Sequence, residues 1–336
     1  MPTSPPWPIT TPGAAPRSRA CGCAIKAACL EAAARALAGC APLLLAGCIP
    51  ASRADAPPAP RVHPTVVSLN PCADAILAEV ADRNQILALS AWSRDPRSTS
   101  MDLALAQRLP STHGTVEEVL ALRPDLVIDG RFIAPATASA YARLGLKLET
   151  VDLAATVEDA RAQVRRLAGL VGHPDRGEAL VARMDAALAA AAPPPGAPPI
   201  PAVVWEPGGI VPGQGTLVSD LLVRTGYTNF SALRGLGQAD RLPLERMLAD
   251  PPRVILVADA GDRAAADQDR ALAHPALRAL TGTTRAAFAP NLLYCGGPTV
   301  IRAAQRLAEV RTQILPRRGR GTAAGGGGVM AKGTAR

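Results

Sequence analysis

Cysteine is the most reactive side chain in this sequence, and its distribution is uneven. The chain has 336 residues and seven cysteines, of which only Cys72 and Cys295 lie beyond residue 50. No spacing resembles a zinc ribbon or a redox Cys-x-x-Cys pair. Three interpretations of Cys72 and Cys295 stay open: two independent thiols, a disulfide formed in an oxidising compartment, or soft ligands to a metal centre in a bound cargo.

A small set of aromatic and polar residues follows the short runs that predict strands. Trp and Phe cover apolar ligand faces, whereas Arg pairs with carboxylate or phosphate. We expect about half of the set to contact a large amphipathic or anionic ligand, with packing of surface loops as the alternative for each residue alone. In the first half the candidates are Asn70, Pro71, Cys72, Trp92, Ser93, Arg94, Arg131 and Phe132. In the second half they are Trp205, Glu206, Gln214, Arg234, Tyr294, Cys295 and Gly296.

Strands that alternate with helices position these loops. Thr65 to Leu69, Ile86 to Leu89, Leu126 to Ile128 and Leu146 to Val151 predict strands, and helical patterns separate them. This alternation is typical of a parallel, doubly wound sheet. The same theme resumes with a strand over Ala202 to Trp205.

A long helical pattern separates the two halves. Apolar residues recur every three or four positions from Val157 to about Ala192, and a run of prolines from Pro193 ends the pattern. Gly172-His173-Pro174 interrupts it, and proline at such a place can kink a helix. We expect one long helix with a kink at this point.

An internal repeat relates the halves. Val116 to Ile128 matches Leu244 to Leu256 position by position, without a gap, so that the offset between the copies is constant. Each copy predicts a short helix with glutamate in its first turn, a proline stop and a buried strand. Two copies separated by a long helix suit a receptor with two lobes.

The segment from Met1 to Cys48 predicts an export signal. A positively charged flank that ends at Arg35 precedes an apolar stretch of about a dozen residues, too short to span a bilayer. The stretch ends in Leu45-Ala46-Gly47-Cys48, which resembles a bacterial lipobox with Cys48 as the lipidated residue. Secretion after ordinary signal cleavage is the alternative. Residues 49–61 read as a Pro/Ala linker, and the basic, Gly-rich residues 316–336 predict a disordered tail.

The net charge of +8 does not indicate a nucleic-acid partner. Residues 1–60 hold five basic and two acidic side chains, and residues 316–336 hold five basic ones and no acid. Removing these from the totals of 36 basic and 28 acidic residues leaves 26 of each. The body is therefore neutral, and a nucleic-acid partner loses its main support.

The ordered motifs resemble a known family. Val66 to Asp74, Leu120 to Val127, Leu242 to Val257, and Tyr294-Cys295-Gly296-Gly297-Pro298 together resemble the periplasmic substrate-binding proteins of ABC importers, in the helical-backbone class for cobalamin and ferric siderophores. The resemblance covers residues 62–315. It implies two doubly wound α/β lobes joined by a single long helix. The expected boundaries are residues 62–152 for the N-terminal lobe, 155–192 for the connecting helix and 201–315 for the C-terminal lobe.

The resemblance also implies a function. The protein would capture a bulky metal chelate, a cobalamin-like corrinoid or a ferric siderophore, between the lobes and deliver it to the permease subunits and their ATPase. It would be a monomer without a cofactor or catalysis, and it would meet the membrane only through a lipid on Cys48. Relatives dock onto the permease through one carboxylate of each lobe, which match Glu117 and Glu245 here. The alternative for both is a glutamate that complements the helix dipole.

Other functions fit the same fold. A haem receptor differs from a corrinoid receptor only in the shape of its loops. A zinc or manganese receptor needs clustered ligands, but His63 lies in the linker, His173 lies beside the helix break, and His113 and His274 look like turn residues. A nitrogenase-like or chelatase-like enzyme would share the lobes, but we find no nucleotide loop or nucleophile turn. A plain scaffold module is the remaining possibility.

Overall fold

A computed structural model describes residues 62–258 and 270–314 of the chain. The lipobox and Cys48, the linker over 49–61 and the tail over 316–336 lie outside the described residues. None of the helices in the described part has the length and apolarity that a bilayer crossing requires.

The first lobe is built on a five-stranded parallel sheet with the strand order β3-β2-β1-β4-β5. Its strands are β1 Val66–Ser68, β2 Ile86–Ser90, β3 Ser111–Thr112, β4 Leu126–Gly130 and β5 Leu148–Val151. Its helices are α1 Pro71–Val80, the 3₁₀ turn η1 Ala91–Arg94, α2 Leu103–Arg108, α3 Val116–Leu122 and α4 Pro135–Arg143. A helix connects each strand to the next, and the chain runs from β1 first toward one edge and then toward the other, so the predicted doubly wound α/β class is confirmed.

The second lobe has a four-stranded parallel sheet with the order β11-β10-β6-β8. Its strands are β6 Ile200–Trp205, β8 Tyr227–Asn229, β10 Val254–Val257 and β11 Thr284–Ala287, with a small antiparallel pair, β7 Ile210–Val211 and β9 Asp240–Arg241. The helices and 3₁₀ turns are η2 Pro207–Gly209, α7 Leu217–Arg224, η3 Ala232–Arg234, α8 Leu244–Ala249, α10 Arg270–Ala273, α11 Pro275–Arg278, η4 Pro290–Leu292 and α12 Pro298–Ile314.

The internal repeat has a counterpart in the topology. The order β2-β1-β4-β5 of the first sheet corresponds to β8-β6-β10-β11 of the second. The repeated segments form α3 and β4 in one lobe and α8 and β10 in the other. The offset found in the sequence is therefore an offset between equivalent elements of two similar lobes.

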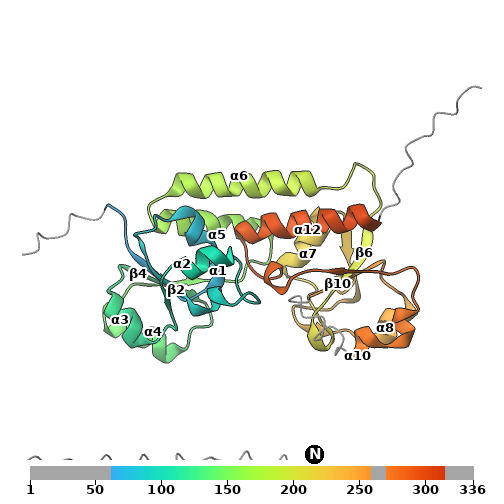
Figure 1. Cartoon of the computed structure of the whole chain (residues 1–336), viewed down its shortest axis with the longest axis horizontal. Coiled ribbons are helices and arrows are strands. Elements are labelled where there is room, and N and C mark those ends of the chain that lie inside the picture. The colour runs from blue at the N-terminus through green and yellow to red at the C-terminus, as the bar shows by residue number, and fades with distance from the viewer. Residues whose placement is uncertain (1–61, 259–269, 315–336) are drawn as a thin grey trace, which may run out of the picture. The chain divides into compact units, whose positions relative to one another are not determined.

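The segment between the lobes differs from the expected single helix. It forms two helices, α5 Val157–Leu170 and α6 Pro174–Ala191, which pack against each other. Gly172 has a φ of 82°, which reverses the chain, and Pro174 starts α6 at a position where no amide donor is needed. The expectation of one helix over 155–192 is wrong in this respect. The helix that joins the lobes is α6 alone, with α5 and α12 packed along it (Figure 1).

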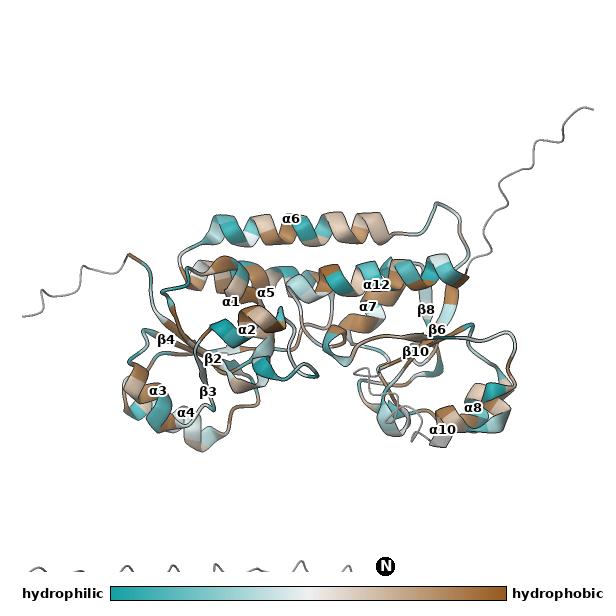
Figure 2. Ribbon diagram, viewed as in Figure 1, coloured by the Kyte–Doolittle hydropathy of each residue, from teal (hydrophilic) through white to brown (hydrophobic). Residues whose placement is uncertain are grey.

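One hydrophobic core runs through both lobes. It takes one face of each sheet, for example Val66 and Val204, and the facing sides of α5, α6 and α12, for example Leu167, Met184 and Leu307. Figure 2 shows that hydrophobic residues concentrate in the central strands of both sheets. Because the core is continuous through α6, the burial of apolar surface holds the two lobes together.

The outer face of each sheet has a smaller core of its own. Strand residues alternate in direction, so Val203, Trp205 and Ile255 face α8, while Val204 and Leu256 face the shared core. The first lobe has the same arrangement, with Val119 of α3 packed on Val67 and Val127. Helices α3 and α8 therefore cover equivalent outer faces, away from α6 (Figure 1).

Candidate functional site

A disulfide brings the loops of the two lobes together. Cys72 and Cys295 are bonded, with their α-carbons 4.9 Å apart at a sequence separation of 223 residues. Asn70 fixes the first cysteine, because its side-chain oxygen accepts hydrogen bonds from the amides of Cys72 and Ala73 at the start of α1. Of the three interpretations of the cysteine pair, the disulfide is the one that the structure contains.

Glycines let the second cysteine approach the first lobe. A β-carbon on Gly296 would lie 2.9 Å from the β-carbon of Ala160, and one on Gly297 would lie 2.5 Å from Cγ1 of Ile76. Gly296 is buried. It therefore serves close packing between the lobes and is not available for the predicted contact with a ligand.

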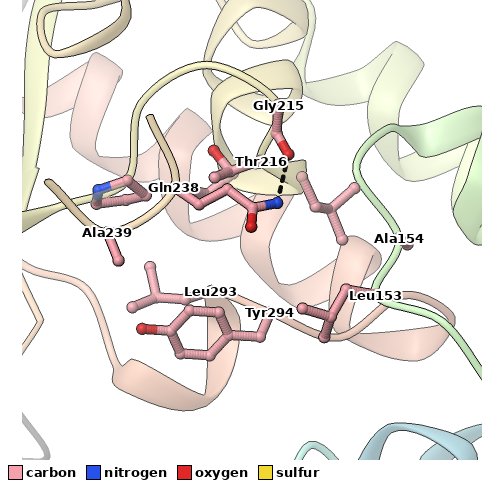
Figure 3. A pocket seen from close by; sticks show the side chains of 11 residues that line it. Leu153, Ala154, Gly215, Thr216, Gln238, Ala239, Leu293 and Tyr294 are labelled. Carbon is pink, nitrogen blue, oxygen red and sulfur yellow. Dashed lines mark hydrogen bonds between the residues drawn. The ribbon is translucent and has the colours of Figure 1, made fainter. Parts of the chain in front are cut away.

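A mainly apolar pocket of about 220 Å³ is lined by Tyr294, the residue that precedes Cys295 (Figure 3). Leu153 and Ala154 come from the connection between β5 and α5, and the remaining walls come from the second lobe. Gln238 closes one side by donating a hydrogen bond from Nε2 to the carbonyl of Gly215, at 3.1 Å. Sites for drug-sized ligands are larger, with volumes that begin at roughly 300 Å³. The pocket therefore suits an edge or a side group of a larger molecule.

Tyr294 and Glu206 form a polar pair at this pocket. The Tyr294 hydroxyl donates a short hydrogen bond to Oε2 of Glu206. Burial and then the neighbouring carboxylate raise the pKa of Tyr294 above its ordinary value. The pair therefore presents a neutral phenol and a carboxylate from two loops of the second lobe.

Two large rings stand uncovered on loops of the first lobe. The side chain of Trp92 follows β2 and is 65% exposed, and Phe132 follows β4 and is 77% exposed. Arg131 lies next to Phe132, with its guanidinium carbon 5.4 Å from the centre of the Phe132 ring and Nε 3.2 Å from Asp152. Exposed rings at the carboxyl ends of parallel strands are placed where open α/β sheets bind ligands.

Comparison with protein families gives the decisive match. The periplasmic binding protein family matches residues 66–284, which include the first sheet, the connecting helices and the second sheet up to the start of β11. The chain belongs to this family. Its helical-backbone class, with two lobes joined by a long helix, agrees with the resemblance found in the sequence.

Solved structures of periplasmic binding proteins share the fold. The haem-binding protein RhuT from Roseiflexus sp. RS-1 has a TM-score of 0.59 and 24% identity, over 74% of this chain and 97% of that one. The haem-binding protein BhuT, solved with two haems, has a TM-score of 0.57 and 25% identity, over 73% of this chain and 98% of that one. The vitamin B12-binding protein BtuF of Vibrio cholerae has a TM-score of 0.56 and 20% identity, over 75% of this chain and 98% of that one. No curated protein sequence matches the chain.

Other predicted contact residues of this periplasmic binding protein have different roles in the structure. Trp205 is 1% exposed in the outer core of the second lobe, and Ser93 is also 1% exposed. Both are wrong as direct contacts, because their side chains are covered. Trp205 ends β6 with the same orientation as Val203, which places its ring under α8.

Three polar candidates are held by neighbouring groups. Arg94 donates to the carbonyl of Leu109 at 2.6 Å, and Gln214 donates to that of Ala232 at 3.2 Å. Arg234 pairs with a carboxylate and stacks 3.3 Å from the centre of the Phe230 ring. Their side chains therefore brace loops of the lobes. Pro71 begins α1 beside the disulfide and is half-buried.

Asp74 is a residue of the site that the sequence motifs contain but whose role we did not predict. Its carboxylate is buried in α1 and accepts hydrogen bonds from the Ser93 hydroxyl at 2.6 Å and the Ser90 amide at 2.9 Å. These bonds tie the loop of Trp92 to α1. Burial raises the pKa of Asp74 to about 7, although the hydrogen bonds oppose the shift.

The raised pKa predicts that stability falls as the pH rises. Asp74 stays protonated in the folded state up to about pH 7 but ionises near pH 3.8 in the unfolded chain. Its contribution is therefore complete below pH 3.8 and lost as the pH rises through 7. Between pH 5 and pH 8 the free energy of unfolding should drop by about 2–3 kcal/mol from this group. Asp74→Asn should remove that part of the pH dependence in denaturant titrations, and an unchanged dependence would assign it to other groups.

Proposed function

We propose that this periplasmic binding protein captures a bulky metal chelate between its lobes and delivers it to the membrane subunits of an ABC importer, without catalysis. The exposed rings of Trp92 and Phe132 carry the proposal, because a flat, largely apolar ligand would cover both. Helical-backbone relatives with haem or vitamin B12 in their names support the class of cargo. The periplasm is the compartment that the family implies.

The charges near the site favour a tetrapyrrole-like chelate over a highly anionic ferric siderophore. Arg94 and Arg234 are bonded within their own lobes, and Arg131 is already paired with Asp152. An anionic siderophore complex would need arginines that are free to pair with it. We therefore propose a corrinoid as the cargo.

Haem is the second candidate, and Tyr294 supports it. A tyrosine oxygen is one of the axial ligands that proteins offer to haem iron. Glu206 already accepts the phenol proton in a short hydrogen bond, so it is placed to stabilise the proton's departure when the oxygen binds a metal. The disulfide removes Cys72 and Cys295 from the possible ligands of the cargo.

Titration with cyanocobalamin, haemin and an anionic ferric catecholate tests the proposal. Saturable quenching of tryptophan fluorescence by cyanocobalamin or haemin, at micromolar or tighter affinity, is the expected result. Trp92→Ala should weaken binding about tenfold, since the ring loses its apolar contact with the cargo. Leu144→Ala is the matched control. Leu144 is also an exposed apolar residue, but it precedes β5 and so lies near the amino ends of the strands, whereas Trp92 follows the carboxyl end of β2.

Two outcomes would decide against parts of this proposal. Binding of the ferric catecholate alone would show that the cargo is a siderophore instead of a tetrapyrrole. If none of the three gives a saturable response, a metal chelate is rejected as the cargo. For haemin, Tyr294→Phe should change the absorption of the bound iron, and an unchanged spectrum would exclude Tyr294 as its ligand.

Glu117 and Glu245 are the proposed contacts with the importer. They occupy equivalent positions in the first turns of α3 and α8, both side chains are exposed, and neither forms an ion pair within the described part of the chain. A carboxylate on each lobe could then pair with an arginine of each membrane subunit. Anchoring through a lipid on Cys48 stays a prediction of the sequence.

A further inference from the structure

A second polar cluster lies near the amino ends of the strands of the first sheet. One ring nitrogen each of His63 and His173 and a carboxylate oxygen of Asp82 lie within 4.8 Å of one another. His63 precedes β1, Asp82 lies between α1 and β2, and His173 lies between α5 and α6. The cluster therefore sits at the amino ends of β1 and β2, whereas the loops of Trp92 and Phe132 follow the carboxyl ends of their strands.

The ligand atoms are already close to the spacing that a metal ion requires. Nε2 of His173 lies 3.3 Å from Oδ2 of Asp82. Zinc binds nitrogen and oxygen at about 2.0–2.2 Å, so two of its ligands in a tetrahedral site stand roughly 3.4 Å apart. The rings of His63 and His173 have their centres 4.3 Å apart. A small rotation of side chains would bring all three atoms around one ion.

Arg176 orients the carboxylate for this role. Its guanidinium donates to Oδ1 of Asp82 at 2.8 Å and to the carbonyl of Val80 at 3.1 Å. The other oxygen, Oδ2, is left facing His173. Carboxylates that bind metals are commonly held in this way by a hydrogen bond to their second oxygen.

Gln85 holds the three segments in place before any ion binds. Its buried side chain donates to the carbonyls of Pro64 and Val171, both at 2.9 Å, and accepts from the amide of Asp82 at 2.8 Å. Its Oε1 also lies 2.8 Å from Nε2 of His173. When a metal takes this nitrogen, the hydrogen bond to Gln85 is exchanged for a bond to the ion.

Gly172 makes room for the first histidine. A β-carbon at this position would lie 2.3 Å from Nδ1 of His63, so any other residue would push the imidazole away. The positive φ of Gly172 also makes the turn that places His173 next to it. The same residue therefore serves the helix reversal and the approach of the two rings.

We propose that His63, Asp82 and His173 bind a divalent transition metal ion, with zinc as the ion best suited to the ligands. Two imidazoles and one carboxylate leave a fourth position for water, which is a common zinc arrangement. Arg176 offsets the charge of Asp82, so the two imidazoles contribute most of the affinity for the metal. Calcium and magnesium prefer oxygen ligands and are therefore excluded as the bound ion. The bound ion would fasten the segment before β1 to the turn between α5 and α6.

Zinc binding to the full chain tests the site. The protein is purified without a histidine tag, and its free thiols are alkylated, because Cys21, Cys23, Cys29, Cys40 and Cys48 would otherwise compete for the metal. We expect one zinc ion per chain and a rise in Tm of about 5 °C at a hundredfold excess over Kd. His63→Ala and His173→Ala should each weaken zinc binding by at least tenfold. His173→Ala also loses the hydrogen bond to Gln85, so the Tm of each variant without metal is measured to separate a loss of stability from a loss of zinc binding.

His113→Ala is the matched control, since His113 is an exposed histidine of the same lobe outside the cluster. It should bind zinc as the unchanged protein does. With cobalt in place of zinc, a visible absorption band should appear in the unchanged protein and be absent from His63→Ala. The proposal is overturned if the unchanged protein binds zinc no more tightly than the double variant His63→Ala, His173→Ala. It is also overturned if calcium stabilises the unchanged protein as much as zinc does.

Discussion

Replacing Glu117 and Glu245 together by lysine should abolish uptake of the cargo while leaving the cargo's affinity for the binding protein unchanged. Both side chains lie on outer faces of the lobes, on α3 and α8, and far in sequence from the loops of Trp92 and Tyr294. Lysine would turn each attraction to a permease arginine into a repulsion, which costs several kcal/mol at an interface. Uptake into vesicles that contain the importer measures the effect, and equilibrium titration measures the affinity.

Asp175→Lys is the matched control for this loss. Asp175 is also an exposed acid in the first turn of a helix, but it lies on α6. All three substitutions lose a favourable interaction with a helix dipole, about 0.3–1 kcal/mol each. If the double lysine variant still supports uptake, or if Asp175→Lys lowers uptake equally, the docking role is rejected. The two glutamates would then only complement the helix dipoles.

Loss of the disulfide should have the largest effect on stability. The bond between Cys72 and Cys295 closes a long loop in the unfolded chain, because the two cysteines have a sequence separation of 223 residues. Loop closure of this length is worth about 5 kcal/mol in the chain-entropy model. The double variant Cys72→Ser, Cys295→Ser should therefore melt roughly 10 °C lower, as measured by calorimetry.

Cys21→Ser serves as the comparison, because Cys21 lies outside the described residues and far from the bridge in sequence. Adding a reductant to the unchanged protein should reproduce the lower Tm, and it should have no further effect on the double variant. An unchanged Tm in the double variant would show that the core through α6 holds the lobes without the bond.

Several regular elements of the fold could be predicted from the sequence, although strands such as β3, β8 and β11 were not among them. Strand β4 and strand β10 are short aliphatic runs after a proline stop, and the constant offset between them revealed two similar lobes. The reversal between α5 and α6 was harder to predict. Gly172 and Pro174 signal a break, but a kink and a reversal give the same signal, and the choice depends on how the apolar sides of the two helices pack.

The position of the ligand site stays a prediction, but the exposure of its candidate residues can be compared with the sequence. Trp92 and Trp205 both end or follow predicted strands, yet one ring is exposed and the other buried. The alternation of Val203 and Trp205 along β6 was the signal that could have separated them. No local pattern could have paired His63 with His173, because the turn at Gly172 and the bonds of Gln85 bring them together.

The core through α6 also affects when the protein can fold during its synthesis. Residues of α12, such as Leu307, complete the same core as Leu167 of α5 and Met184 of α6. A polypeptide leaves the ribosome with its amino end first, so α5 and α6 emerge before the helix that covers them. Until α12 emerges, their apolar surfaces stay open and the compact state is not favoured. The order of elements along the chain thus favours folding only after α12 has been made.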